Sequence, residues 1–387
     1  MLSDLQKVAS VAQAPSAYDG RRVVLIHDWL TGMRGGERVL EVLCALFPQA
    51  PLFTLLHVPG SISDIIENRA ITTSPLQRMP MASQKYRYYL PLFPAFAEMT
   101  KVRNCDLAIS TSHAVAKAMV GAGRSRPFHV CYIHSPMRYV WDRFDDYFGQ
   151  DRVGVLSSRF FFRPIAKGLQ VYDQRTNARV DVFIANSRFV AERVRKLYNR
   201  KAEVLPPPID LERFGGLARQ PEDWYLVVAA FVPYKRVDHA IAACASLGRS
   251  LKIAGCGPEA NKLAALGRDL GANVEFLGFL SDQDLASYYS RARALLFPGV
   301  EDFGMVPVEA MAAGCPVIAL GKGGILDSMT ASTGVLYCEE TVEALKNAIA
   351  DFESRFFDSM EIRKRSTAFS KPTFVNGFNA ILDLAMF

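Results

Sequence analysis

The chain alternates short apolar runs with longer segments in which apolar residues recur every three or four positions. The short runs are rich in Val, Ile, Leu and Phe without strict polar alternation, which is typical of strands buried on both faces of a parallel sheet. The longer segments have the spacing of amphipathic helices. We expect strands at residues 23–27, 106–110, 129–134, 182–186, 203–205, 225–230, 251–254, 274–277, 294–297, 316–320 and 334–337. We expect helices at residues 37–46, 187–197, 259–270, 281–291 and 308–313. This repetition predicts α/β sheets with right-handed crossovers.

A run of three prolines at residues 206–208 interrupts the pattern. Because proline neither continues a helix nor joins a central strand, the run predicts a stiff connector between two α/β domains of similar size. We place the first domain at residues 1–205 and the second at residues 206–371. Each would be doubly wound, so ligands should bind at the carboxyl ends of the strands, facing a cleft.

Charge is distributed unevenly between the two halves. The 387 residues are 50% hydrophobic and 22% charged, which is typical of a globular protein of two or three domains. Residues 1–210 carry a net charge of +10 and residues 211–387 one of −4. Either the first domain faces an anionic partner, such as a membrane surface, nucleic acid or phosphorylated substrate, or the difference is chance variation. No helix-turn-helix, RNA-recognition or zinc-finger pattern supports nucleic acid.

The sequence does not indicate export or a membrane span. No apolar run approaches the ~18 residues that a membrane helix needs, and the first twenty residues lack the apolar core of a secretory signal. Seven scattered cysteines without a CxxC pair argue against a disulfide framework and against structural zinc. We therefore expect a protein of the reducing cytoplasm.

Two glutamates, Glu301 and Glu309, flank the segment between an expected strand and an expected helix. Gly304 frees the backbone ahead of that helix, and Pro307 suits its first turn. A helix start attracts phosphate or sugar oxygens. Glu309, which we place in the first turn, can bond a vicinal diol such as a ribose, and Glu301 can reach a second polar group. Alternatively, the pair only caps and solvates the helix start.

The sequence around these glutamates resembles the C-terminal half of the retaining, nucleotide-sugar-dependent GT-B glycosyltransferases of family 4. The matching blocks are VPYKRVD (232–238), AGCGPE (254–259), the segment 276–320 and GKGGILDSM (321–329). Weaker matches in the first half resemble members that act in bacterial cell-surface polysaccharide assembly, often with GDP-mannose; these blocks are residues 27–43, 132–142 and 184–198. The resemblance implies a GT-B fold, with two Rossmann-like domains facing across a cleft. It also implies that a last helix, about 372–387, crosses back to the first domain.

The resemblance assigns a donor site to the second domain. It implies that Glu309 binds the nucleotide ribose, that Glu301 lies near the transferred sugar and that Lys235 contacts the diphosphate. Fixed cations and N–H donors suit the negative charge that develops on a departing diphosphate. The backbone that would bind sugar hydroxyls and phosphate belongs to Phe303, Gly304, Met305 and Val306.

One position departs from the family pattern. Many relatives carry an arginine five residues before the lysine, where this chain has Ala230. Arg236, next to Lys235, is a candidate to supply the missing cation, although its side chain would point elsewhere if the two alternate. Gly257, in the AGCGPE block, completes the predicted donor-binding set.

The first domain offers a glycine pair and a histidine at expected strand ends. Gly35 and Gly36 lie between the first strand and the following helix, where glycine lets a backbone approach a phosphate or an acceptor closely. Their resemblance to the Gly-Gly loop in the family's first domain implies that they bind the donor; a simple tight turn is the alternative. His134 ends a strand. A lone histidine is more often structural, but the resemblance implies that this one faces the donor sugar and hydrogen-bonds it or stabilises charge near the anomeric carbon.

The acceptor side is assigned less directly. His27 and Asp28 end the first expected strand, close to the acceptor in the resembled fold, and we take them as candidate acceptor contacts. Arg138 is a third candidate, and Trp141 and Asp142 would shape the same region.

Basic and aromatic residues gather in two segments of the first half. Between residues 74 and 103 a single acid, Glu98, accompanies the following residues: Arg78, Lys85, Arg87, Lys101, Arg103, Tyr86, Tyr88, Tyr89, Phe93 and Phe96. Residues 159–163 form a second cluster. Such patches suit peripheral contact with the anionic inner face of the plasma membrane; ordinary helix packing with surface charge is the alternative. A polyprenyl-diphosphate-linked acceptor would explain both patches.

Together these features predict a retaining glycosyltransferase that moves a hexose onto a lipid-linked or oligosaccharide acceptor in bacterial exopolysaccharide or O-antigen synthesis. The favoured hexose is mannose, with GDP-mannose as its donor. The resemblance implies front-side attack, with the leaving phosphate taking the acceptor proton. Asp145–Asp146 is the only adjacent aspartate pair and does not end a strand, so we expect no metal and no cofactor. A UDP-sugar donor and a non-catalytic nucleotide-sugar-binding subunit remain alternatives.

Overall fold

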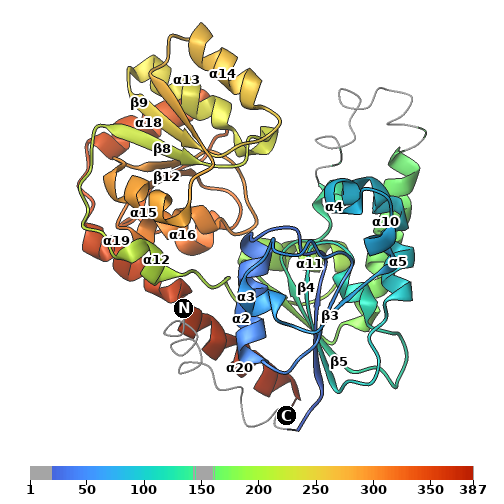
Figure 1. Ribbon diagram of the computed structural model, residues 1–387. Helices are drawn as coiled ribbons and strands as arrows, with labels where there is room; N and C mark the ends of the chain where they lie inside the picture. Colours follow the sequence, from blue (N-terminus) through green and yellow to red (C-terminus); the bar gives the residue numbers. More distant parts are fainter. Residues whose placement is uncertain (1–19, 143, 145–159, 161, 387) are drawn as a thin grey trace. The chain divides into compact units, whose positions relative to one another are not determined.

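The computed structural model describes residues 20–142, 144, 160 and 162–386 (Figure 1). The chain divides into two compact units, Met1–Pro208 with Phe374–Phe387, and Ile209–Thr373. The predicted boundaries were 205/206 and 371/372. Every expected strand is present, with ends displaced by at most two residues.

The first unit is built on a seven-stranded parallel sheet in the order β3-β2-β1-β4-β5-β6-β7. Its strands are β1 (Val23–His27), β2 (Leu52–Thr54), β3 (Ile71–Thr73), β4 (Leu107–Ser112), β5 (Phe128–Ile133), β6 (Val182–Ala185) and β7 (Glu203–Val204). Strands β2 and β3 are absent from the sequence-based expectation, since three residues are too few to show a period. The order reverses between β1 and β4, and ligands of such sheets bind outside the carboxyl ends of the strands at that switch point.

Helices cover both faces of this sheet, because successive strand residues point to opposite sides. Leu25 belongs to the core beneath α2, α3 and α20, whereas Val24 and Ile26 belong to the core beneath α4, α5 and α10. The helices of this unit are α2 (Gly35–Leu46), α3 (Asp64–Glu67), α4 (Ala82–Lys85), α5 (Phe93–Met99), α6 (Arg138–Trp141), α10 (Arg163–Thr176), α11 (Arg188–Tyr198) and most of α20 (Lys371–Met386). The described residues of this unit also form the 3₁₀ helices η2 (Pro75–Arg78), η3 (Tyr86–Leu92), η4 (Ala116–Met119) and η6 (Asn177–Arg179).

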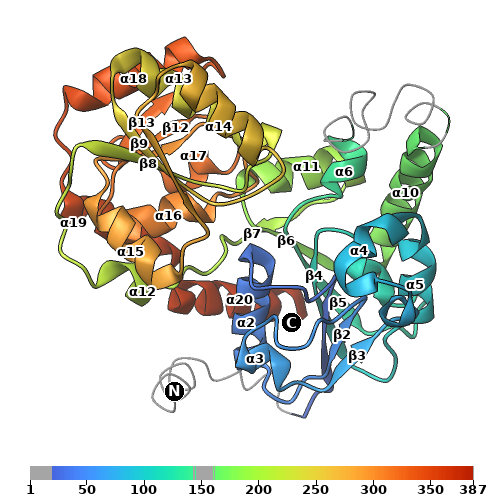
Figure 2. The ribbon, with the colours of Figure 1, turned by 45° about the horizontal axis from the view of Figure 1, so that its top comes forward.

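The second unit holds a six-stranded parallel sheet in the order β10-β9-β8-β11-β12-β13, which reverses between β8 and β11. Its strands are β8 (Trp224–Val228), β9 (Ser250–Ala254), β10 (Val274–Gly278), β11 (Leu295–Phe297), β12 (Val317–Leu320) and β13 (Gly334–Tyr337). Its helices are α12 (Leu211–Gly215), η7 (Pro233–Lys235), α13 (Val237–Leu247), α14 (Ala260–Asp269), α15 (Asp282–Arg291), α16 (Met305–Ala312), α17 (Ile325–Ser328), α18 (Val342–Glu353), α19 (Ser359–Ser366) and η8 (Thr367–Phe369). Helices α13, α14 and α18 cover one face, and α12, α15, α16 and α19 the other (Figure 2).

Candidate functional site

In the second unit, Lys235 and Glu301 form an ion pair at the switch point of the sheet. Lys235 ends η7 after β8, and Glu301 follows β11, the neighbouring strand. The two loops touch at Gly299, where a Cβ would lie 2.6 Å from the Tyr234 carbonyl oxygen and 2.8 Å from the Lys235 Cα. Only glycine fits such a contact, so the loop packing holds the lysine and the glutamate together.

Arg236 is turned toward other acids. Its backbone is left-handed, with φ of 53°, and its guanidinium lies 3.3 Å from the Asp238 carboxylate and 3.7 Å from that of Glu340. It also contacts His239, whose pKa is lowered by burial and by this guanidinium. The geometry therefore gives no support to Arg236 as the replacement for the arginine missing at Ala230.

Helix α16 begins at Met305, three residues earlier than the sequence predicted. Gly304 is its N-cap with φ of 85°, a conformation that favours glycine, and Pro307 falls in the first turn as expected. Glu309 is consequently in the second turn, and its predicted place in the first turn is wrong. Its half-buried carboxylate accepts a hydrogen bond of 3.3 Å from the Tyr289 hydroxyl.

The remaining predicted donor residues of the second unit lie at the start of α16 and on the loops beside it. Met305 and Val306 occupy the first two helical positions of α16, whose N–H groups have no partner within the helix. Phe303 is buried against Phe369, so only its backbone is available for the predicted role. A Cβ on Gly257 would lie 2.6 Å from the Phe231 carbonyl oxygen, so this glycine packs the loop after β9 onto the loop after β8.

In the first unit, three histidines meet at the carboxyl ends of three adjacent strands. His27 ends β1, His113 follows β4 and His134 follows β5. The ring centroids of His27 and His113 are 6.2 Å apart, and those of His113 and His134 are 6.3 Å apart. The sequence analysis did not identify His113; its position after an expected strand was the available signal.

Gly35 and Gly36 are the first two residues of α2, rather than a loop before it. A Cβ on Gly36 would lie 3.4 Å from the His27 Cε1 atom and 3.5 Å from the His134 Nε2 atom. These are ordinary van der Waals contact distances, so Gly36 lies directly beside both rings. Gly36 thus places the start of α2 against His27 and His134.

His27 and Asp28 do not fit their predicted role as acceptor contacts. Both side chains are fully buried. The Nδ1 atom of His27 is 2.6 Å from the Thr111 hydroxyl. The Asp28 carboxylate accepts four backbone N–H bonds of 2.6–2.9 Å from the consecutive residues 113–116. Asp28 therefore caps the segment that leads into η4.

His134 is half-buried, and its Nε2 atom has no hydrogen-bond partner among the described residues. Burial, with the neighbouring His113 and His27 adding to it, lowers the pKa of His134 to about 3. The ring is therefore neutral near pH 7, and its predicted contact with the donor sugar would be a hydrogen bond rather than an ion pair.

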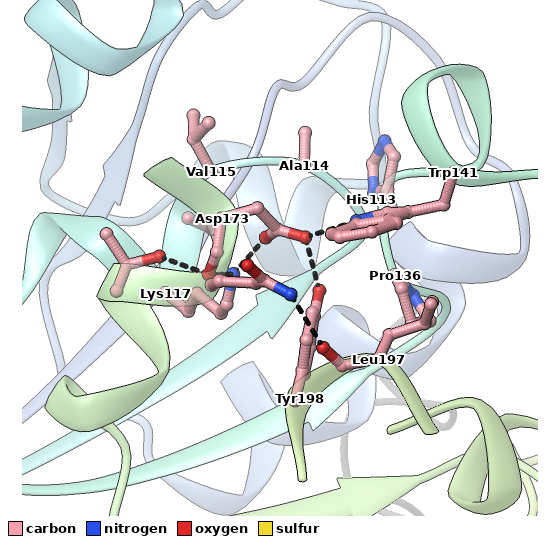
Figure 3. Close-up of polar contacts among 12 residues, drawn as sticks. His113, Ala114, Val115, Lys117, Pro136, Trp141, Asp173, Leu197 and Tyr198 are labelled. Atoms are coloured by element: carbon pink, nitrogen blue, oxygen red, sulfur yellow. Dashed lines mark hydrogen bonds and ion pairs between the residues drawn. The ribbon is translucent and has the colours of Figure 1, made fainter. Parts of the chain in front are cut away.

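The residues of α6 are tied to a buried ion pair that the sequence analysis missed (Figure 3). Trp141 donates from Nε1 to the Asp173 carboxylate over 2.8 Å, and the Tyr198 hydroxyl donates to the same oxygen over 2.7 Å. Asp173 also pairs with Lys117 of η4, and both side chains of this pair are almost fully buried. Trp141 is thus a structural anchor of this region.

The other predictions in this region have separate outcomes. Asp142 pairs with Arg193. Arg138 begins α6 with a half-buried side chain, and its acceptor role stays a prediction. Asp145 and Asp146 lie outside the described residues, as do Arg159 and Phe161 of the second basic cluster.

Two family models match the chain in succession. Residues 33–213 match the model described as Glycosyltransferase Family 4, and residues 209–366 match the one described as Glycosyl transferases group 1. The chain is 32% identical over 180 residues to a D-inositol 3-phosphate glycosyltransferase of Mycobacterium sp. (strain KMS), covering 40% of each chain. It is 28% identical over 206 residues to a GDP-mannose-dependent monoacylated alpha-(1-6)-phosphatidylinositol monomannoside mannosyltransferase of Corynebacterium glutamicum, covering 46% of this chain and 54% of that protein. The matches thus span about half or less of these curated relatives.

Solved structures share the architecture over nearly the whole chain. The apo lipopolysaccharide outer core galactosyltransferase WaaB has a TM-score of 0.66 at 17% identity, and Anabaena HepE in complex with UDP has 0.66 at 16%. Each comparison covers 94% of this chain and 99% of the other, and at these identities it shows the fold alone. The two switch-point sheets and these neighbours define the GT-B fold. Since the two family models together span residues 33–366, the chain belongs to the family 4 glycosyltransferases.

Proposed function

We propose that this chain transfers a hexose to a lipid-linked or oligosaccharide acceptor in the assembly of bacterial cell-surface polysaccharide. The hexose that we propose is mannose, with GDP-mannose as its donor. The observation that carries the proposal is the Lys235–Glu301 pair at the switch point of the second unit, beside loops whose glycines admit close backbone contacts. GDP-mannose is favoured because several similar proteins are named GDP-mannose-dependent mannosyltransferases. A UDP-sugar is the alternative donor, because HepE, which shares the fold, was solved in complex with UDP.

In this proposal the second unit stabilises the departing nucleoside diphosphate. Lys235 exchanges the Glu301 carboxylate for a phosphate oxygen, and the free N–H groups at the start of α16 add donors. Glu301 is then released to bond the transferred sugar, and Glu309 the ribose. The acceptor hydroxyl attacks the anomeric carbon from the face that the phosphate leaves, and the phosphate takes its proton. Retention and independence from metal ions are parts of this proposal.

The donor is tested by thermal unfolding of the full chain with nucleotide sugars and with EDTA present throughout. Ligand at about one hundred times its Kd stabilises a protein by about 2.7 kcal/mol, so GDP-mannose should raise the melting temperature by a few degrees, with UDP-glucose as the comparison. Stabilisation by UDP-glucose alone would assign the alternative donor. If no nucleotide sugar shifts the transition, the proposed donor site is wrong.

We also propose that the first unit docks on an anionic bilayer. Of the predicted aromatic patch, Tyr86, Phe93 and Phe96 are core residues. The exposed apolar side chains of that segment are instead Met81, Tyr88, Leu92 and Met99, at 55, 81, 45 and 69%. The exposed cations among them are Arg78, Lys85, Arg87 and Arg103, and the single acid Glu98 is paired with Lys101 and Arg179. Exposed apolar groups among unopposed cations suit a headgroup layer.

Reversing the charge of Lys85 and Arg87 together is expected to weaken binding to vesicles of phosphatidylcholine with 30% phosphatidylglycerol. Each basic residue near such a surface contributes about 1 kcal/mol, so the affinity should fall at least tenfold in a vesicle co-sedimentation assay. Lys262→Glu with Lys364→Glu, the same charge change on exposed lysines of the second unit, should have little effect. Equal losses from both double variants would show a general charge effect and contradict this docking face.

Within the described ranges 20–142, 144, 160 and 162–386, no helix combines the length and apolar character needed to cross a bilayer.

A further inference from the structure

Asp28 and His113 form a pair at the switch point of the first unit. Asp28 follows β1 and His113 follows β4, the two strands between which the sheet order reverses. The Nδ1 atom of His113 lies 3.3 Å from the Asp28 Oδ2 atom. Because Asp28 is fully buried and accepts four backbone N–H bonds, its position is fixed by the fold.

The His113 ring is held on two sides and open on a third. Its edge packs on Trp29, with ring centroids 4.4 Å apart and planes at 85°. The side chain nevertheless keeps 31% of its surface exposed, and its Nε2 atom has no hydrogen-bond partner among the described residues. The side chain is thus oriented from within and offers one ring nitrogen outward.

The chemistry of this pair fixes what Nε2 can do. The Asp28 carboxylate oxygen, 3.3 Å from Nδ1, favours the tautomer with the hydrogen on Nδ1, which leaves a lone pair on Nε2. Burial lowers the pKa of His113, and His27 and Arg34 act in the same direction while Asp28 and Glu37 oppose them. The ring is therefore neutral near pH 7, and Nε2 is an oriented hydrogen-bond acceptor for a hydroxyl group.

We propose that His113 is an acceptor-binding residue: its Nε2 atom accepts a hydrogen bond from a non-reacting hydroxyl of the acceptor sugar, and Asp28 acts as the positioning residue that orients it. This inference rests on the proposed function, and it takes the first unit as the acceptor side, as the family resemblance implies. The non-reacting hydroxyl is specified because the attacking hydroxyl gives its proton to the leaving phosphate.

Two variants separate this role from a structural one. In His113→Asn the amide can still donate to Asp28 in place of Nδ1, but nothing replaces Nε2. In His113→Gln the longer amide reaches toward the Nε2 position, and the contact with Asp28 is lost. Steady-state transfer from GDP-mannose is measured with the octyl α-glycosides of mannose, glucose and galactose as acceptor probes, together with donor affinity by calorimetry and melting temperature.

We expect His113→Asn to raise the KM of the best octyl glycoside roughly tenfold, the usual size of one lost substrate hydrogen bond, with the donor Kd and the melting temperature unchanged. We also test versions of that glycoside that each lack one hydroxyl group. For one of them the KM of the wild-type chain should rise by a similar factor, and His113→Asn should not raise the KM for that same compound any further. His113→Gln should retain more acceptor affinity than His113→Asn.

Other outcomes would overturn the inference. One is an unchanged acceptor KM in His113→Asn, and another is a loss confined to the donor. A third is a wild-type chain that hydrolyses GDP-mannose yet uses none of the three glycosides. A wild-type chain that neither binds nor cleaves any nucleotide sugar would instead overturn the proposed function, so the two failures are distinguishable.

Discussion

Replacing Lys235 by alanine is expected to lower kcat/KM for the nucleotide-sugar donor by about two to three orders of magnitude, the loss typical of removing a preorganised group from a developing negative charge. The leaving group is a diphosphate, and the Lys235 ammonium is held at the switch point by the loop contact at Gly299 and by Glu301. Alanine removes the charge and leaves the loop backbone in place. Donor affinity should therefore fall together with turnover.

Arg236→Ala is the matched control, since it removes a neighbouring cation of the same loop. Its guanidinium is engaged by Asp238 and Glu340, so we expect less than a threefold change in kcat/KM if it makes no contact with the donor. Steady-state kinetics and donor calorimetry on both variants measure the difference. A Lys235→Ala chain with wild-type donor affinity and rate, or a larger loss in Arg236→Ala, would show that the diphosphate lies elsewhere.

The position of the candidate site in the second unit could be predicted from the sequence because its residues belong to local motifs. Lys235, Gly257 and Glu301 follow β8, β9 and β11, and the strand order places those strand ends on one edge of the sheet. Glu309 lies in α16, the helix that follows β11. The error there was also local. Because Gly304 adopts a φ of 85°, α16 starts directly after it. The pattern of apolar residues predicted a start three residues later. Glu309 thereby moved from the first turn to the second.

The first unit was less predictable because its interactions join residues far apart in the chain. Asp28 bonds to residues 113–116, which lie 85 to 88 positions later, and Lys117 bonds to Asp173, 56 positions later. No spacing or motif marks such pairs. The sequence analysis therefore predicted that Asp28 contacts the acceptor, whereas its carboxylate binds backbone N–H groups of the fold. It also overlooked His113, the residue that this carboxylate orients.

Replacing Asp173 by alanine is expected to destabilise the first unit by about 3–5 kcal/mol, the usual cost of leaving a buried charge without its partner. Lys117 would keep its ammonium in a nearly dry environment, and the Trp141 Nε1–H and Tyr198 hydroxyl would lose their common acceptor. Burial, with Asp173 beside it, raises the pKa of Tyr198, so this hydroxyl stays protonated and needs an acceptor.

Urea unfolding measures the loss, and hydrogen exchange of peptides from η4 and α10 locates it in the first unit. Asp106→Ala is the control, because its ion pair with Arg22 is solvent-exposed and should contribute little. In the double variant Lys117→Met with Asp173→Leu no charge is stranded, so it should recover part of the stability lost in Asp173→Ala. An Asp173→Ala chain as stable as the Asp106→Ala control would mean that Lys117 finds water or another partner, and that α6 and α10 are held by apolar packing rather than by this ion pair.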